Sequence, residues 1–221
     1  MKTAILDVGG TLIGAPNLFE EMADIFNSTV NRNQIISDLK TTFNQKFKLQ
    51  RETDNEFLTV EQIIEQTLNE ISVKYDSGDK GQFARSLYHD VFVNKSHLYP
   101  DTLPFLKGLR DAGTRILVAS DADAWLIHKE FEKFEIADYF DGYCISSNVN
   151  AYKPTDKFVN AFKSKFSFDT SKAIMVGDAV VDILFGKKLN VKTAFINRGE
   201  KHSDMKSDYS VTDLRLLLQY F

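Results

Sequence analysis

The sequence predicts an α/β fold, a doubly wound parallel sheet of the Rossmann type that carries an inserted all-helical cap. Short, continuous apolar runs recur in the second part of the chain, as expected for strands buried on both faces. Segments with apolar residues at helical spacing separate these runs, and such alternation is typical of a parallel sheet. One long stretch after the first run shows helical spacing alone, which indicates a separate helical module.

The composition allows one full core and a smaller module, because the chain has 221 residues and 43% of them are hydrophobic. The net charge is -4, and Lys and Arg are scattered rather than grouped in blocks. We therefore expect a small-molecule ligand and no nucleic acid.

The single cysteine, Cys144, excludes an internal disulfide and is typical of a small buried residue. Charge interrupts the apolar start of the chain at Asp7, so no signal segment is expected. No apolar run approaches the roughly 20 residues of a membrane span. These features predict a cytoplasmic protein without membrane contact, and they make no prediction of its oligomeric state.

The first predicted strand covers residues 3–8, and residues 16–96 contain no comparable run. Instead, apolar residues recur there at helical spacing, and the clearest examples are Phe19, Met22, Ala23, Phe26, Val60, Ile63, Ile64, Thr67, Leu68 and Ile71. Residues 52–56 and 75–81 are rich in charge or glycine and are predicted turns inside this module.

From Pro100 onward the pattern alternates strictly between helix and strand. The predicted helices cover residues 101–112, 122–134, 155–166 and 180–189, and the predicted strands cover residues 115–119, 142–146, 173–176 and 192–196. We therefore expect a core of residues 1–14 and 97–221 and a cap of residues 15–96. The Gly and Pro residues near 14–16 and 98–100 are the predicted hinges.

Four short polar motifs follow predicted strands or the loops between them. They are Asp7-Val8-Gly9-Gly10-Thr11, Ser120-Asp121, Lys153-Pro154 and Gly177-Asp178 followed by Asp182. In open α/β sheets, ligands bind outside the carboxyl ends of the strands, so these motifs are expected to meet at one edge. A carboxylate nucleophile, a hydroxyl, an ammonium and a further pair of carboxylates are the groups that phosphoryl transfer on a divalent metal requires.

In these motifs and their order, the chain resembles the haloacid dehalogenase-like (HAD) superfamily of aspartate-nucleophile hydrolases, in its helical-cap branch. The resemblance implies that Asp7 is the nucleophile and that Thr11, Ser120 and Lys153 assist it. It also implies Mg²⁺ as cofactor and hydrolysis of a small phosphorylated metabolite. The expected substrate contacts are Gly10 and Asp121, together with backbone N–H groups of the turn. The expected metal site has Asp7 and Asp178 as direct ligands and the Gly9 carbonyl as a third, while Asp182 would hold a metal-bound water or support the ligands.

Gly9 departs from the pattern of the family, whose phosphatases usually carry a second Asp at this position as general acid and base. Such a group typically contributes 10²–10⁴-fold in rate. Three consequences stay open: a substrate with a good leaving group, a donor supplied by the cap or by Asp121 or Asp123, or loss of turnover.

Three alternative functions remain beside the phosphatase. A 2-haloacid dehalogenase needs no metal and would not explain the two late acids, Asp178 and Asp182. A phosphonatase-like hydrolase would need a Schiff-base lysine in the cap, with Lys40, Lys46 and Lys48 as candidates. A non-catalytic module could use the same groups to bind a phosphorylated ligand or a protein.

Several residues also have ordinary structural explanations. Ser120 could be a helix N-cap, Lys153 a surface lysine before a turn proline, and Asp182 a local cap or ion-pair partner. His97 and His128 fit no metal spacing, and no histidine is assigned a role.

Overall fold

The computed structural model describes residues 1–26, 31–52, 56–199 and 206–221 of the chain. Its main sheet has six strands: β1 (Thr3–Leu6), β4 (Arg115–Ser120), β5 (Gly142–Ile145), β6 (Ala173–Gly177), β7 (Lys192–Ile196) and β8 (Tyr209–Val211). Their order in space is β5-β4-β1-β6-β7-β8, and every neighbouring pair is parallel. The predicted parallel α/β sheet is confirmed.

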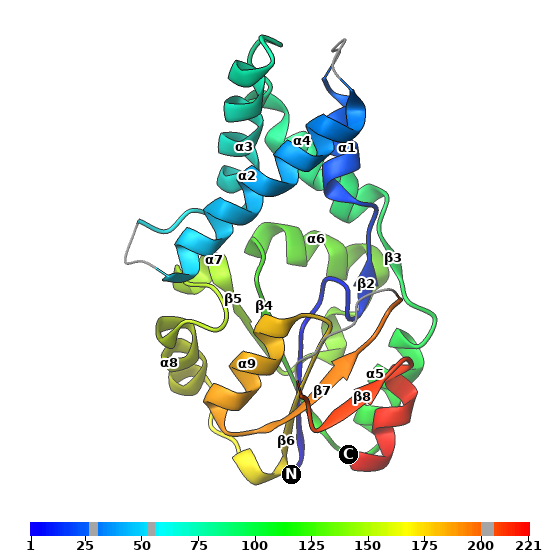
Figure 1. Ribbon diagram of the computed structural model, residues 1–221. Helices are drawn as coiled ribbons and strands as arrows, with labels where there is room; N and C mark the ends of the chain where they lie inside the picture. Colours follow the sequence, from blue (N-terminus) through cyan, green and yellow to red (C-terminus); the bar gives the residue numbers. More distant parts are fainter. Residues whose placement is uncertain (27–30, 53–55, 200–205) are drawn as a thin grey trace.

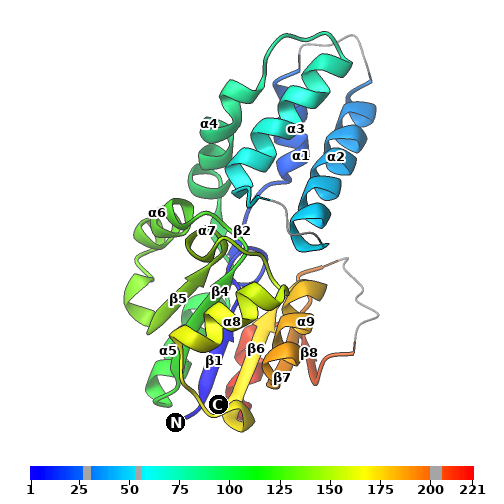
Figure 2. The same cartoon turned by 90° about the vertical axis from the view of Figure 1, so that its left-hand side faces the viewer.

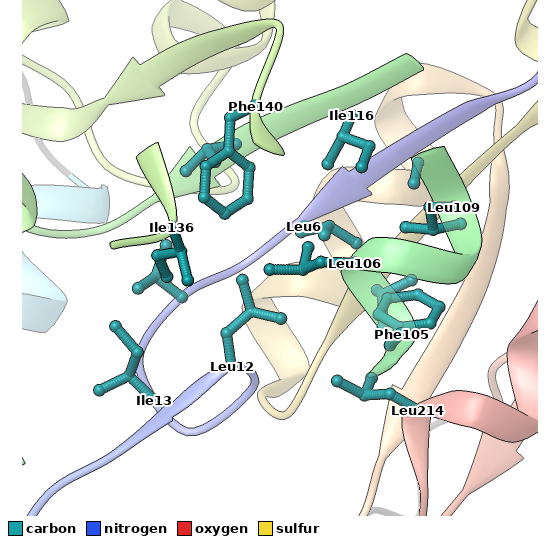
Figure 3. Packing of buried hydrophobic residues seen from close by; sticks show 14 of the residues in the cluster. Leu6, Leu12, Ile13, Phe105, Leu106, Leu109, Ile116, Ile136, Phe140 and Leu214 are labelled. Carbon is teal, nitrogen blue, oxygen red and sulfur yellow. The ribbon is translucent and has the colours of Figure 1, made fainter. Parts of the chain in front are cut away.

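In the described part of the chain, the α-helices that accompany the sheet are α5 (Thr102–Asp111), α6 (Ala124–Phe134), α7 (Ser146–Val149), α8 (Asp156–Lys165) and α9 (Val180–Leu189). Successive side chains of a strand point to opposite faces, and in β1 Ala4 and Leu6 belong to one apolar cluster while Ile5 belongs to another. The first cluster includes side chains of α5 and α6 and of the 3₁₀ segment Leu214–Tyr220, and Figure 3 shows its centre. The second includes side chains of α8 and α9, so the sheet is covered on both faces.

A helical module is inserted between two very short strands, β2 (Ile13–Gly14) and β3 (His97–Leu98), which pair antiparallel. It contains α1 (Leu18–Asp24), α2 (Arg32–Glu52), α3 (Val60–Lys74), α4 (Ala84–His89), a 3₁₀ turn at Gly81–Phe83 and a π-helical turn at Asp90–Asn94. Figures 1 and 2 show these helices beyond the carboxyl end of β1, whereas both chain termini lie at the opposite end of the molecule.

The insert has an apolar cluster of its own, built from one face of each helix. In α3 the residues at helical spacing, among them Ile63, Ile64 and Leu68, are fully buried, as the sequence pattern predicts. Thr59 caps this helix, because its hydroxyl accepts the N–H of Gln62 while the Gln62 side chain accepts the N–H of Thr59. This pattern explains why the sequence alone identifies the module.

The structure differs from the predicted elements in a few places. The first strand ends at Leu6 rather than residue 8, because Val8 already accepts the turn hydrogen bonds of residues 11–13. The short helix α7 and the edge strand β8 carried no periodic signal and were not predicted. Of the predicted turns, residues 75–80 lie between helices, whereas residues 53–55 are outside the described part of the chain. Among the described helices, none combines the length and apolarity needed to cross a membrane.

Candidate active site

Three neighbouring strands of the sheet deliver polar side chains to one edge. Leu6 pairs with Val118 in β4 and with Val176 in β6, so the residues just beyond these positions lie side by side. Asp7, Ser120 and Asp178 are these residues, and all three line a cavity of about 670 Å³. The carboxyl ends of strands β1, β4 and β6 therefore lie together at one edge of the sheet, as the order of the motifs predicts.

Lys153 lies at the centre of the polar groups and is 1% exposed. Its ammonium donates to Oδ1 of Asp7 at 2.7 Å, to Oδ1 of Asp182 at 2.6 Å and to the carbonyl of Ala119 at 2.8 Å. All three donors of the ammonium are therefore used, and a surface lysine before a proline is the wrong explanation for this residue.

Asp7, Asp178 and Asp182 each offer a carboxylate oxygen, and these oxygens lie within 4.8 Å of one another. Burial raises the pKa of Asp7 well above its usual range, against the opposing charge of Lys153, and the charges of Asp182 and Asp178 raise it further. Burial also raises the pKa of Asp182. Three buried acids face one buried ammonium, so the cluster carries excess negative charge when all are ionised. A divalent cation with oxygen ligands fits this donor set.

Asp182 supports the cluster from the start of α9. One of its oxygens binds Lys153, and the other accepts the N–H of Ala179 at 3.0 Å, as an acid in the first turn of a helix commonly does. Both oxygens have protein partners, so the contacts of the alternative explanation, a local cap and an ion pair, are present. The role of Asp182 in a metal site stays a prediction.

The turn after Asp7 is closed by its own backbone. The N–H of Gly10 donates to the carbonyl of Ile13 at 2.8 Å, and the N–H of Thr11 donates to that of Val8 at 3.2 Å. In this structure these two N–H groups are thus bound within the turn, and the expected contact of the turn with a substrate stays a prediction. Gly10 has a φ of +78°, and a Cβ there would lie 2.4 Å from Oδ2 of Asp178, so only glycine allows this close approach.

Thr11 is fully buried, and its hydroxyl lies 3.5 Å from Oδ2 of Asp7 and 3.4 Å from Oδ1 of Asp178. Its carbonyl accepts a hydrogen bond from Arg198 at 2.6 Å, and Arg198 also binds both oxygens of Asp101 at 2.8–2.9 Å. The ion pair of Arg198 and Asp101 thus fixes the backbone of the turn at Thr11. The sequence did not predict this pair.

Ser120 is the last residue of β4 and Asp121 follows it, and the two side chains differ in their partners. Ser120 is buried and lines the cavity, and among the described residues its hydroxyl forms no hydrogen bond. Helix α6 begins only at Ala124, so Ser120 is not its N-cap. The carboxylate of Asp121 accepts the Ser146 hydroxyl at 2.9 Å and the Lys153 N–H at 2.8 Å, and it also pairs with Arg51. Asp121 is thus engaged by protein groups.

Arg51 connects the insert to the strand ends. From the end of α2, its Nη2 reaches Asp121 at 2.9 Å and its Nε donates to the Lys153 carbonyl at 2.8 Å. Beside it, the Tyr152 hydroxyl donates to the Leu58 carbonyl at 2.7 Å. The insert therefore binds two consecutive residues of the core, Tyr152 through its hydroxyl and Lys153 through its carbonyl.

The insert also forms the apolar wall of the cavity. Side chains from α1, α2, α4 and the turn after α4 line it: Leu18, Phe19, Phe43, Phe47, Tyr88 and Phe92. Of the three candidate Schiff-base lysines, only Lys48 lines the cavity, and its side chain is 70% exposed and lies 3.8 Å from Glu52. Such an exposed lysine lacks the burial that activates a Schiff-base amine.

Glu130 is a further acid of the cavity that the sequence reasoning missed. It lies on α6, is 3% exposed and lines the cavity together with Leu126 and Ile127. Its sequence signal is one acidic residue at the spacing of the apolar face, four residues after Leu126 and three after Ile127. Asp123, by contrast, accepts the N–H groups of Val60 and Glu61 at the start of α3 and does not line this cavity.

A parallel sheet with a helical insert over buried carboxylates and a buried lysine defines a class of α/β hydrolases. Residues 24–196 match the model of the haloacid dehalogenase-like hydrolases. The chain therefore belongs to the haloacid dehalogenase-like hydrolase family.

Individual enzymes match the chain at low sequence identity. The chain is 28% identical over 143 residues to a phosphoglycolate phosphatase of Vibrio vulnificus, which covers 61% of this chain and 63% of that enzyme. It is 23% identical over 203 residues to a glyceraldehyde 3-phosphate phosphatase of Pyrococcus abyssi, which covers 90% of this chain and 83% of that enzyme. The chain spans between 52% and 63% of the phosphoglycolate phosphatases that head the comparison.

Solved structures share the fold. An L-2-haloacid dehalogenase from Xanthobacter autotrophicus superposes with a TM-score of 0.76 at 13% identity, covering 99% of this chain and 97% of that one. A HAD phosphatase from Thermococcus onnurineus superposes with a TM-score of 0.69 at 19% identity, covering 99% and 97%. Both reaction types thus occur on this architecture.

Proposed function

We propose that the protein is a Mg²⁺-dependent phosphatase of a small phosphorylated metabolite, with Asp7 as nucleophile. The observation that carries this proposal is the contact of one buried ammonium with two buried carboxylates, Lys153 with Asp7 and Asp182, beside a third acid, Asp178. Relatives named phosphoglycolate phosphatase and glyceraldehyde 3-phosphate phosphatase support the same reaction type. A cytoplasmic location stays a prediction.

In this proposal Asp7 is the group that attacks phosphorus. Lys153 holds its Oδ1, and the Thr11 hydroxyl lies near its Oδ2, so both oxygens have a fixed direction. Attack forms an aspartyl-phosphate and releases the alcohol, and water then hydrolyses the acyl phosphate. The ammonium of Lys153 and the hydroxyl of Ser120 offset the charge of the phosphoryl oxygens during both steps.

The residues that would hold Mg²⁺ are Asp7, Asp178 and the carbonyl of Gly9, with Asp182 fixing Lys153 beside them. When bound, Mg²⁺ supplies positive charge that reduces the repulsion between the carboxylates and a phosphate dianion. The excess of buried acids over buried cations and the raised pKa of Asp7 support such a site.

We further propose residues 15–96 as a cap that selects the substrate. Its wall over the cavity is largely aromatic, with Phe19, Phe43 and Phe47 among the lining side chains, and Lys48 and Arg51 lie at its border. An apolar wall favours a leaving group with an apolar body, because the burial of apolar surface is worth about 25 cal/mol per Å². Cap closure over such a substrate would also exclude water from the first step.

A dehalogenase would have the same fold, but its reaction gives no role to the third acid, Asp178. Displacement of a halide by Asp7 needs no cation, and Asp178 would then add only repulsion to the site. A non-catalytic phosphate-binding module would keep the cluster and lack turnover. The same assay separates both alternatives from the phosphatase.

The test is hydrolysis of 4-nitrophenyl phosphate with Mg²⁺, with EDTA, and in an Asp7→Asn variant, with Asp24→Asn in an exposed ion pair as matched control. We expect turnover that EDTA abolishes and that Asp7→Asn lowers by more than about 10³-fold, as loss of a nucleophile does. Turnover of 2-chloropropionate in EDTA would instead establish a dehalogenase. Binding of phosphate without any turnover would establish the binding module.

A further inference from the structure

At Gly9 the cavity has open space that a proton-donating side chain would occupy. A Cβ on Gly9 would meet no atom within 4 Å, and Gly9 lines the cavity next to Asp7. An alkoxide leaving group is too basic to depart readily without a proton, so hydrolysis of an alkyl phosphate needs a donor from elsewhere.

Most acids of the cavity are already committed. Asp7, Asp178 and Asp182 form the cluster around Lys153, and Asp121 binds Arg51. Glu52 is exposed and lies beside Lys48, which it pairs with at 3.8 Å. These five carboxyls therefore belong to the acid cluster, pair with a cation of the protein, or face solvent.

Glu130 is the acid that remains. It is 3% exposed and lines the same cavity as Asp7 and Gly9, and among the described residues its carboxyl forms no hydrogen bond and no ion pair. The cation one turn further along α6, Lys133, donates instead to the carbonyls of Val93, Asn94 and Ser96. A buried carboxyl without a partner is stable in its protonated form.

The charged groups around Glu130 agree with that state. Burial and the nearby charge of Asp7 raise its pKa to about 8, while Lys133 opposes this shift. Tyr88 also lines the cavity, and burial, together with the charges of Asp123 and Glu130, raises the pKa of its phenol. This phenol is therefore a far weaker acid than Glu130. At pH 7 Glu130 therefore carries a proton that it can release to a developing alkoxide.

We propose that Glu130 is the general acid of the phosphatase, in place of a side chain at position 9; this inference rests on the proposed function. As Asp7 Oδ bonds to phosphorus and the P–O bond to the leaving group breaks, the Glu130 proton moves to the departing oxygen, directly or through one water. In the second step the Glu130 carboxylate takes a proton from the water that attacks the aspartyl-phosphate. Phosphate and the Asp7 carboxylate are released, and Glu130 is protonated again.

The test compares two esters in Mg²⁺, 2-phenylethyl phosphate and 4-nitrophenyl phosphate, in the parent and in Glu130→Gln. The readout is kcat/KM, because it reports the steps up to departure of the leaving group. We expect a fall of about 10²–10³-fold for the alkyl ester, which needs the proton, and a change of less than about 3-fold for the nitrophenyl ester. An unchanged ratio of the two values in Glu130→Gln would overturn the proposal.

Two further variants sharpen the result. Gly9→Asp in the Glu130→Gln background places a carboxyl in the open space and should restore most of the alkyl-ester activity. Glu132→Gln, at an exposed acid on the same helix, is the matched control and should change neither substrate. In the unmodified protein, the alkyl-to-nitrophenyl ratio should fall as the pH rises above the pKa of Glu130, which tests the proposal without any substitution.

The outcomes separate this proposal from the function on which it rests. If the parent hydrolyses neither ester, or if Asp7→Asn keeps full activity, the phosphatase itself is wrong, and the role of Glu130 with it. If the parent hydrolyses the nitrophenyl ester in an Asp7-dependent way but not the alkyl ester, only the general acid is wrong.

Discussion

The Nζ of Lys153 lies 2.7 Å from Oδ1 of Asp7, and both side chains are nearly inaccessible to solvent. A pair in such a setting depends on each partner, because removal of one leaves the other as a buried, unpaired charge. The same ammonium also binds Asp182 at 2.6 Å, so the loss of Lys153 would leave three acids without a cation.

Lys153→Met should lower the free energy of unfolding by about 3–5 kcal/mol at pH 8 without metal, as for other broken buried pairs. The loss should be smaller at pH 5. With the ammonium gone, the folded-state pKa values of Asp7 and Asp182 rise further above their unfolded values, so stability falls as the pH rises between the unfolded and folded values. Urea denaturation in EDTA at both pH values checks this.

Lys188→Met is the matched control, since Lys188 pairs with Asp156 at the surface with both side chains exposed. Its unfolding curve should coincide with that of the parent at both pH values, as is usual for exposed pairs. Equal losses in the two variants would show that Lys153 has no special electrostatic role.

Glu130 should make the protein less stable as the pH rises. Its pKa is about 8 in the folded state against a reference of 4.5, so the folded protein binds the proton more tightly, and stability falls between pH 4.5 and 8. Glu130→Gln removes this dependence. We expect the variant to gain on the order of 3 kcal/mol relative to the parent between pH 5 and pH 8, measured by urea denaturation in EDTA. Parallel pH profiles of the two proteins would contradict the raised pKa.

Gly10→Ala should weaken metal binding while Gly9→Ala should not. A Cβ at position 10 meets the Asp178 carboxylate and requires a positive φ, at a cost of about 1–2 kcal/mol for the backbone alone. A Cβ at position 9 enters open space. The rise in melting temperature caused by Mg²⁺ measures binding without any assay of activity. We expect this rise to be lost in Gly10→Ala and kept in Gly9→Ala; the same response in both would contradict the proposed ligand Asp178.

Arg51 and Asp121 should be coupled energetically, because they join the insert to the end of β4 at 2.9 Å and are largely shielded from solvent. A double-mutant cycle of Arg51→Met and Asp121→Asn should give a coupling energy of about 1–2 kcal/mol in urea denaturation. Arg51→Lys should recover little of it, since a lysine cannot bind Asp121 and the Lys153 carbonyl with one planar fork. Additive effects of the two substitutions would show that the pair does not hold the insert.

The sheet could be predicted because buried parallel strands leave an unmistakable signal. In β4, Ile116 and Val118 face one cluster while Leu117 and Ala119 face the other, so every position is apolar and no alternation appears. Helix α7 and strand β8 lacked such a signal, because each is short and partly exposed.

The site could be predicted only where residue types and local motifs suffice. Asp7 and Asp178 follow strands whose ends must meet, so their proximity follows from topology. The contacts of Arg51 and Glu130 depend on how distant helices pack, and one sequence does not encode that packing in a readable pattern. The hydrogen bonds within the turn at Gly10 could not be predicted for a related reason, since they depend on how the backbone folds back toward Val8 and Ile13.

The ribbon of Ile13 with Leu98 and Gly14 with His97 has an evolutionary consequence. It brings the first and last residues of the insert close together. The order of strands in the main sheet therefore does not depend on the length or shape of the insert. Among the described residues of the apolar cluster that holds the insert together, the sheet-bearing part of the chain supplies two buried members, Leu126 and Tyr152, and the partly buried Trp125 packs against this cluster. A lineage could therefore exchange the whole insert by recombination, adjust the few core side chains that contact it, and acquire a new substrate while inheriting the old chemistry.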